Sequence, residues 1–267
     1  MTARTLTMRV VPPLPRRWRG QYLVERNILG TKTFWPVLAS GFFEPVFYLF
    51  AIGVGIGQLA GDVTVGGVPV PYEAFVAPAM LAASAMNGAV FEATNMFFKL
   101  RYGKVYDAIL ATPVEPTEVA SGEIAWTLAR GAMYSAAFLV VMAVMGLISS
   151  PLGLLAFPAS LLIGFAFGAL GTAAVTWMRS WQDLDLVTLI VLPLFLFSAT
   201  FYPIEVYPAF IQAVTWVSPL YHGVILIRGL TLGILEWTML INIAYLTALG
   251  VIGSIITARR VKQVLLK

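Results

Sequence analysis

The sequence predicts an all-α polytopic membrane protein, and two observations carry that prediction. Of 267 residues, 59% are hydrophobic and only 11% are charged, against roughly 25% charged residues in an ordinary soluble domain. The apolar residues are also gathered into separate runs, several of them near the roughly 20 residues that a helix needs to cross the hydrocarbon of a bilayer. Lipid is therefore expected to be the main solvent of this chain.

Six uninterrupted runs predict six transmembrane helices. They cover residues 34–57, 75–98, 124–147, 152–177, 186–202 and 237–256. A seventh run, residues 206–227, contains no Asp, Glu, Lys or Arg, but Pro208 and Pro219 interrupt it, and each proline removes a backbone donor. We therefore expect residues 203–228 to form a broken, re-entrant pair of short extracellular helices between spans 5 and 6. The residues that mark this segment are Tyr202, Pro203, Glu205 and Pro219.

The basic residues orient the predicted spans. Lys and Arg gather before residue 34, between the second and third spans, and after residue 256, whereas the opposite side keeps Arg228. Positive charge collects on the cytoplasmic side of membrane proteins. The sequence thus predicts a protein of the cell (plasma or inner) membrane with both termini cytoplasmic, residues 1–33 forming an arm and residues 257–267 a basic tail.

The arm carries an amphipathic pattern. Trp18, Tyr22 and Leu29 fall on one helical face, and Arg19 and Arg26 fall on another. Such a helix lies in the inner membrane interface and contacts lipid. Contact with a protein partner is a further possibility that the pattern leaves open.

Composition excludes several kinds of site. The chain has no cysteine and a single histidine, His222, so no metal site and no catalytic residues are predicted; an intramembrane enzyme would need a convergent base and nucleophile. The net charge of +4 comes from residues flanking apolar runs, which favours anionic lipid and not nucleic acid as partner. No Gly-x-x-x-x-Gly-Lys-[Ser/Thr] loop is present, so no nucleotide cofactor is expected in this chain.

The loop between the second and third spans contains a short predicted helix. Residues 105–111 can form two turns that expose Tyr106, Ile109 and Leu110. Thr112, with Glu115 three residues later and Pro113 between them, has the form of a capping box that begins the next helix. A helix lying on the membrane surface and a helix docked on a soluble partner are both compatible with this pattern.

Three ionisable residues fall inside predicted spans, where each needs a partner or water. At ~1.5 Å per residue, Glu44 lies ~15 Å deep and both Glu92 and Arg130 lie ~9 Å deep. Because Glu92 and Arg130 are level, we expect them to pair between the second and third spans, with Glu44 nearby. The pair either fixes helix register or meets substrate.

These features together resemble a known family. The chain presents a basic amphipathic arm, six spans, the loop Tyr-Asp-Ala-Ile-Leu-Ala-Thr-Pro-Val and the later segment Phe-Tyr-Pro-Ile-Glu, in that order. Further matching stretches are Glu44-Pro45, Phe75-Val-Ala-Pro-Ala-Met-Leu, Ala83-Ser-Ala-Met-Asn, residues 101–122 and residues 198–203. Over nearly its whole length the chain resembles permease subunits of type-2 ABC exporters, in particular the lipo-oligosaccharide (nodulation-type) and daunorubicin-resistance-type permeases.

The resemblance implies an assembly and a function. Two permeases, here a homodimer, would join two copies of a separate ATPase subunit that binds ATP and Mg. The loop helix would be the coupling helix on that ATPase, through Tyr106, Asp107, Ile109, Leu110, Thr112 and Pro113. The cargo would be amphiphilic (a lipid, lipid-linked glycan or hydrophobic drug), since the spans offer few polar groups. An ATP-independent transporter or channel is the alternative.

Overall fold

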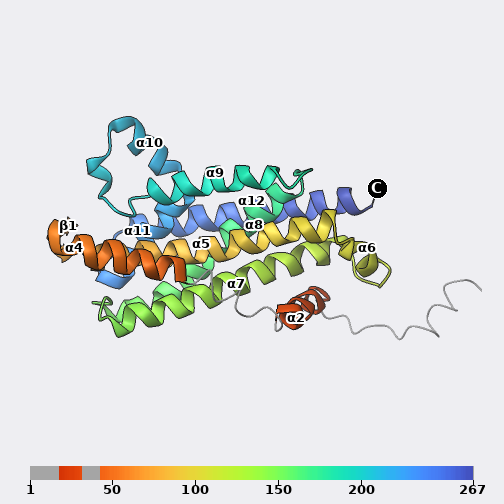
Figure 1. Ribbon diagram of the computed structural model, residues 1–267, viewed down its shortest axis with the longest axis horizontal. Helices are drawn as coiled ribbons and strands as arrows, with labels where there is room; N and C mark the ends of the chain where they lie inside the picture. Colours follow the sequence, from red (N-terminus) through yellow and green to blue (C-terminus); the bar gives the residue numbers. More distant parts are fainter. Residues whose placement is uncertain (1–17, 32–42, 267) are drawn as a thin grey trace, which may run out of the picture.

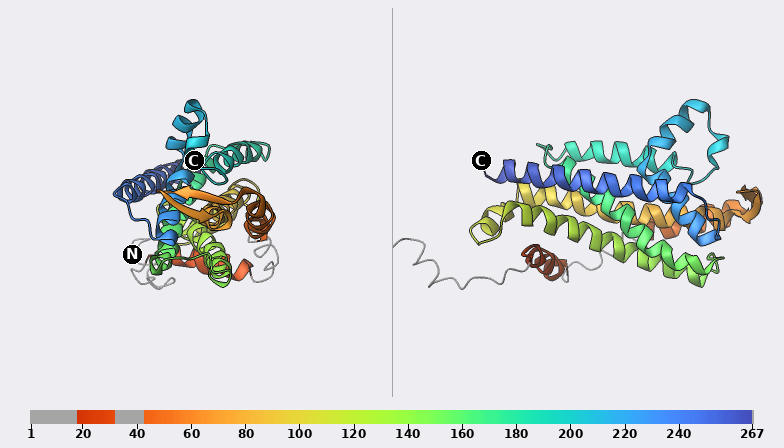
Figure 2. Two further views of the ribbon diagram at one scale, coloured as in Figure 1. Left: turned by 90° about the vertical axis from the view of Figure 1, so that its left-hand side faces the viewer. Right: turned by 180° about the vertical axis from the view of Figure 1, so that it is seen from behind.

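The computed structural model describes residues 18–31 and 43–266. Figure 1 shows long helices lying side by side, with the short helix α6 (Val105–Leu110) and the C-terminus at one end of the bundle. The hairpin that contains β1 (Asp62–Val65) and the helix α10 (Ala209–Val217) lie at the other end. Figure 2 shows the same bundle end-on and from behind.

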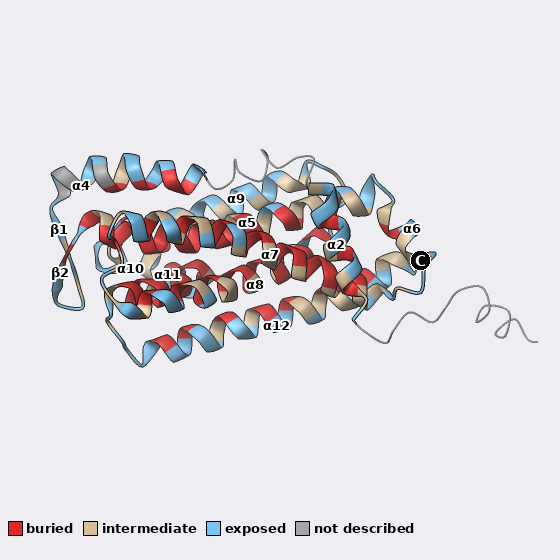
Figure 3. Ribbon diagram, turned by 90° about the horizontal axis from the view of Figure 1, so that it is seen from below, coloured by how far each residue is buried: buried red, intermediate tan, exposed pale blue. Residues whose placement is uncertain are grey.

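Four long helices form the body of the bundle. They are α5 (Tyr72–Arg101), α7 (Pro116–Val144), α8 (Ala156–Val175), which follows the 3-10 turn η3 (Pro151–Leu155), and α12 (Thr238–Leu265). Buried residues concentrate on α5, α7 and α8, while α12 is exposed along much of its length (Figure 3). Among the described helices, four are long and apolar enough to cross a membrane, or five if the bent pair of α10 and α11 (Pro219–Leu232) is one span.

Small residues let these helices approach closely. A Cβ atom on Gly88 of α5 would lie 2.9 Å from the Cα atom of Gly131 on α7. A Cβ atom on Gly253 of α12 would lie 2.8 Å from the backbone of Ala169 on α8. Van der Waals contact of this kind drives helix association in lipid, where burial of apolar surface contributes little free energy to association. The small-residue stretch of α8 is therefore a seam within one chain.

Helices occupy the predicted windows 75–98, 124–147, 152–177 and 237–256, but their ends differ. The largest difference is at the C-terminus, where α12 continues to Leu265 through most of the predicted tail. No Gly or Pro stands after Gly253, so nothing interrupts the helix. Thr257 and Val261 are also buried against the bundle.

The remaining predicted windows, 34–57 and 186–202, also contain helix. Part of window 34–57 lies outside the described residues; the described part is a helix at Phe43–Gly57, with a π-helical turn, η2 (Leu49–Val54), leading into α4 (Gly55–Ala60). Helix α9 (Asp183–Leu196) has 14 residues, which is ~21 Å of helix. The predicted continuation to residue 202 is wrong, because the chain turns at Ala199, whose φ is 53°.

Between α4 and α5 the chain forms a hairpin, which was not predicted from the sequence, so the fold is not entirely helical. Strand β1 pairs antiparallel with β2 (Val68–Pro71), with Val65 opposite Val68. Gly66 and Gly67 have φ of 56° and 83°, which is the two-residue turn that glycines favour in hairpins.

The predicted broken pair at residues 203–228 is present as two helices. After the short turn η4 (Ile204–Val206), α10 and α11 meet at 84°. Ser218 stands at the break, where its hydroxyl accepts a hydrogen bond from the Tyr221 N–H and Pro219 takes the first helical position. Helix α11 runs to Leu232, past the predicted end, and therefore carries Arg228 into the protein interior.

Candidate functional site

The loop helix α6 sits at the junction of α5 and α7, at the end of the bundle that holds the C-terminus (Figure 1). It begins after Lys104, whose φ of 44° turns the chain sharply. The exposed residues of α6 and the turn after it are Asp107, Ala108, Ala111, Thr112 and Pro113, while Ile109 and Leu110 are half-buried. A small polar and apolar surface is thus presented away from the bundle.

The sequence predicted that Tyr106 would be exposed on this surface. That prediction is wrong, because the side chain is buried and only 1% exposed. Its hydroxyl donates a 3.0 Å hydrogen bond to Oε1 of Glu123 on α7. Burial, and next the Glu123 carboxylate, raise the pKa of Tyr106 well above its ordinary value. The tyrosine therefore fastens α6 to the bundle as a neutral donor.

The predicted capping box is also displaced by one turn. Glu115, not Thr112, caps α7: its side chain accepts from the backbone at Glu118, and the Glu118 carboxylate accepts from the Glu115 N–H at 3.0 Å. Pro116, not Pro113, occupies the start of the helix. Thr112 instead donates to the Ile109 carbonyl at 2.6 Å and closes the preceding turn. The sequence offers two such patterns, and in the second the carboxylates of Glu115 and Glu118 each complete one half of the capping box.

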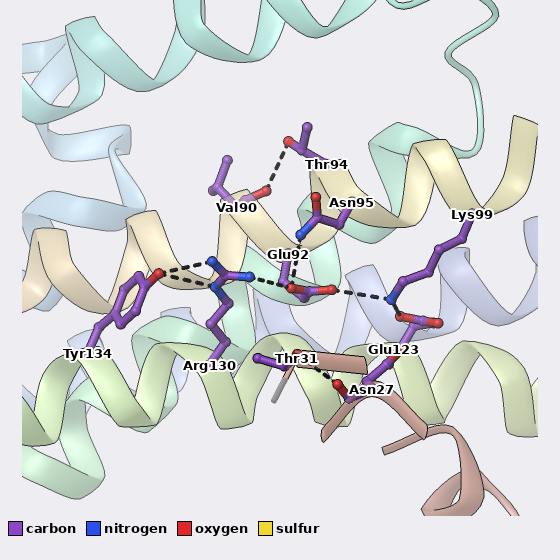
Figure 4. A network of polar contacts seen from close by, with 10 residues as sticks. All are labelled: Asn27, Thr31, Val90, Glu92, Thr94, Asn95, Lys99, Glu123, Arg130 and Tyr134. Atoms are coloured by element: carbon purple, nitrogen blue, oxygen red, sulfur yellow. Dashed lines mark hydrogen bonds and ion pairs between the residues drawn. The ribbon is translucent and has the colours of Figure 1, made fainter. Parts of the chain in front are cut away.

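Four charged side chains form a buried network between α5 and α7 (Figure 4). Arg130 Nη1 lies 2.8 Å from Glu92 Oε2, so the predicted pair is present. Lys99 Nζ bridges the two carboxylates, 3.2 Å from Glu92 Oε1 and 2.8 Å from Glu123 Oε2. Two cations and two carboxylates balance, which is what burial of charge requires.

The network links α6 to the middle of the bundle. Tyr106 bonds to Glu123 at one end, and at the other Nε and Nη2 of Arg130 donate to the Tyr134 hydroxyl at 3.2 and 3.0 Å. Asn95 adds a 3.1 Å bond to Glu92. A continuous set of polar contacts therefore joins α6 to Tyr134, which lies more than two helical turns from Glu123 along α7.

Helix α2 (Gly20–Thr31) covers α7 beside this network. Its buried face is Gly20, Leu23 and Asn27, and the Trp18 indole N–H donates to Ser121 at 2.9 Å. Trp18, Tyr22 and Leu29 remain exposed, at 48%, 37% and 63%, and Arg26 is exposed as well. The predicted amphipathic helix exists, and it also contacts α7.

Comparison with known proteins identifies the family. The sequence pattern of the family described as "ABC-2 type transporter" matches residues 20–232. The chain belongs to the ABC-2 type transporter family. It is 32% identical over 218 residues to Nodulation protein J of Rhizobium leguminosarum bv. trifolii, covering 81% of this chain and 80% of that protein. Identity to Nodulation protein J of Sinorhizobium fredii is 32% over 225 residues, covering 82% of each chain.

This ABC-2 permease has a cavity of about 430 Å³ next to the network. Residues from four helices line it, among them Glu44, Asn87, Phe91, Tyr134 and Asp185. Phe91 also stacks on the Arg130 guanidinium at 4.2 Å. Glu44, predicted near the Glu92 and Arg130 pair, is exposed to this cavity and forms no ion pair among the described residues.

Four residues were singled out for the predicted re-entrant segment. Tyr202 and Glu205 are exposed, Pro203 is half-buried and Pro219 begins α11. Tyr202 and Pro219 do not share a site with the intramembrane charges. Within the described ranges, no group of three or more His, Asp or Glu side chains could hold a metal ion.

The sequence interpretation missed Lys99 and Glu123, because both stand at the ends of predicted spans and were read as loop residues. A helical signal was available: Glu92 and Lys99 are seven residues apart and so share a face of α5. It also missed Arg228. The predicted re-entrant segment ended at this residue, whereas α11 continues to Leu232 and buries it.

Proposed function

We propose that this chain is the membrane-spanning permease subunit of an ATP-driven ABC exporter. Two copies form the path for an amphiphilic substrate, and two separate ATPase subunits bind ATP and Mg. The family match and the resemblance to Nodulation protein J support membrane transport as the general activity.

The observation that carries the proposal is the attachment of α6. A surface helix of six residues has too few backbone hydrogen bonds to be stable alone. The hydrogen bond from Tyr106 to Glu123 attaches it to the buried network. ATPase closure against Asp107, Ile109, Leu110, Thr112 and Pro113 would then move Glu123 and Lys99. Through Arg130 and Tyr134, that motion would reach the cavity of about 430 Å³.

The proposed topology has six crossings with both termini cytoplasmic. The helix at Phe43–Gly57, α5, α7, α8, α9 and α12 supply the crossings, and the bent pair α10–α11 is re-entrant on the outer side. The membrane segment is residues 34–256, between the arm 1–33 and the basic residues of 257–267. Helix α9 has no buried residue, so its apolar surface is available to lipid or to the second permease copy.

Co-purification tests this proposal. The chain is tagged and co-expressed with an ABC ATPase encoded beside it, and ATP hydrolysis is measured for the purified assembly. Asp107→Lys, on the exposed face, should abolish capture of the ATPase, while Arg101→Lys, which preserves charge outside α6, serves as the matched control. If no ATPase is captured or stimulated by the unchanged chain, an ATP-independent transporter or channel becomes the better description, with an intramembrane enzyme less favoured.

A further inference from the structure

A second cavity, of about 240 Å³, lies at the opposite end of the bundle from α6, among α10, α11, the start of α12 and the hairpin. Its lining combines buried polar groups with aromatic rings. The lining residues used below are Arg228, Asn242, Glu205, Glu236, Trp216 and Tyr221.

Arg228 is 4% exposed and has no ion-pair partner among the described residues. Its Nε donates to the Phe75 carbonyl at 3.2 Å and its Nη2 donates to the Ala199 carbonyl at 2.8 Å. The Phe75 ring covers the guanidinium at 3.8 Å. Nη1 has no hydrogen-bond partner in the described part of the chain, so a buried guanidinium with no carboxylate in ion-pair contact lines the cavity.

The positioning of Arg228 uses strained backbone. Ala199 has φ of 53°, in the left-handed region that is costly for a residue with a Cβ atom. Hydroxyl contacts hold the turn around it: Ser198 and Ser218 are 2.7 Å apart, and Thr200 donates to the Phe195 carbonyl at 2.7 Å. That conformation directs the Ala199 carbonyl to the guanidinium.

Asn242 supplies a second group without a partner. It is 5% exposed, and its Nδ2 is buried with no hydrogen bond. His222 Nδ1 lies 2.7 Å from Asn242 Oδ1, and His222 Nε2 lies 2.9 Å from the Trp216 carbonyl, which can only accept. With a doubly protonated imidazole, Nδ2 remains free; with a neutral one, the amide turns over and its oxygen remains free. In either orientation, one polar atom of the Asn242 amide has no hydrogen-bond partner within the described ranges.

A buried polar group without a partner is costly, and Asn242 Nδ2 lines the same cavity as Arg228, whose Nη1 forms no hydrogen bond within the described ranges. We propose that this cavity binds an oxyanion, the phosphate or carboxylate of a small anion or of an amphiphile's headgroup. Arg228 Nη1 and the Asn242 amide are its two inner contacts, and bound anion favours the amide orientation that presents Nδ2. The exposed Glu205 and Glu236 at the mouth weaken binding, although water screens them more than it screens the buried cation.

Ligand binding by the full-length chain in maltoside detergent tests this inference without ATP or the ATPase. Inorganic phosphate, a short-chain phosphatidic acid and the matching diacylglycerol are titrated by calorimetry. We expect phosphatidic acid to bind and diacylglycerol not to bind. Phosphate binding equal to that of phosphatidic acid assigns the site to a free anion, and at least about tenfold weaker phosphate binding assigns it to an amphiphile.

Three variants separate the site from nonspecific binding. Asn242→Asp puts a carboxylate into the cavity with little change in shape and should weaken phosphatidic acid binding about tenfold or more. Glu236→Gln removes a repulsive charge and should strengthen it severalfold. Gln263→Glu makes the same amide-to-acid change on the exposed far end of α12 and should leave it unchanged. Equal binding of diacylglycerol, no binding of any probe, or an Asn242→Asp affinity equal to that of the unchanged chain would overturn the proposal.

Discussion

Glu92 holds two cations at once, one through each carboxylate oxygen. Arg130 binds Oε2 and Lys99 binds Oε1, and both Glu92 and Arg130 are at most 5% exposed at their side chains. The guanidinium is further satisfied by Tyr134. At the residue scale, each charge in this network is therefore neutralised by neighbours, and removing one member leaves its direct partner with fewer opposite charges.

Arg130→Met should lower the free energy of unfolding by about 3–5 kcal/mol, the usual cost of breaking a buried pair from one side. Adding Glu92→Gln should recover part of that loss, because it removes the carboxylate that only Lys99 still neutralises in the single variant. Recovery should be incomplete, since Lys99 then keeps only Glu123. Thermal unfolding in detergent measures all four members of this double-mutant cycle. A double variant less stable than the sum of the single losses contradicts the coupling.

The buried phenol of Tyr106 should make the free energy of unfolding depend on pH. Its pKa is raised above the ordinary value of 10.0, so the folded protein holds the phenol proton more tightly than the unfolded chain does. This contribution is complete below pH 10 and is lost as pH rises through the folded-state pKa. Tyr106→Phe should lower stability by about 1–3 kcal/mol near neutral pH, and the difference from the unchanged protein should narrow above pH 10. Tyr102→Phe, at an exposed phenol beside it, is the control.

At the scale of elements, one glycine determines how α2 sits on α7. A Cβ atom on Gly122 would lie 2.9 Å from the Gly20 carbonyl oxygen and 3.0 Å from the Leu23 Cβ atom. Backbone atoms cannot move aside as a flexible side chain can. The contact between α2 and α7 therefore requires a residue without a Cβ atom at position 122. The amphipathic helix is thereby held against α7, next to the network.

Gly122→Ala should loosen α2 and cost about 1–3 kcal/mol of its packing. Limited trypsin digestion reads this out, because Arg19 and Arg26 lie at and within α2 and should be cleaved faster. Gly30→Ala is the matched control, since nothing lies within 4 Å of a Cβ atom there. Equal cleavage rates for the two variants would mean that α2 is held by other contacts.

At the scale of the molecule, the two ends of the bundle differ in chemistry. One end carries α6, the buried charge network beneath it and the basic end of α12. The other end carries the hairpin, α10 and the cavity at Arg228. Proposed ATPase docking and proposed anion binding are therefore separated by the length of the bundle, and the Arg228 cavity can be studied independently of ATP.

The absence of cysteine from the chain makes the proposed topology directly testable. Thr112→Cys and Lys262→Cys should react with a membrane-impermeant maleimide only after the cells are permeabilised. Asp62→Cys, in the hairpin, should react in intact cells. All three positions are exposed. Labelling of Lys262→Cys in intact cells would mean an odd number of crossings between α6 and the C-terminus.

Much of the fold could be predicted from the sequence because lipid imposes local rules. Span length, charge position and proline placement are properties of short segments, and they located four long helices, the broken pair near Ser218 and the pairing of Glu92 with Arg130. The hairpin turn at Gly66 and Gly67 was visible as turn chemistry, although its strands were not predicted.

Tertiary structure decided which of these side chains act together. Tyr106 looked exposed because it lies on a loop, but α5 and α7 converge beneath it and Glu123 supplies an acceptor. Arg228 looked like a loop charge, but α11 continues past it and folds it against Phe75 and Ala199. By itself the sequence determined membrane residence, most helices and one ion pair, since those depend on local polarity and rise. The network and the second cavity required the fold, because their partners are distant in sequence and meet only through packing.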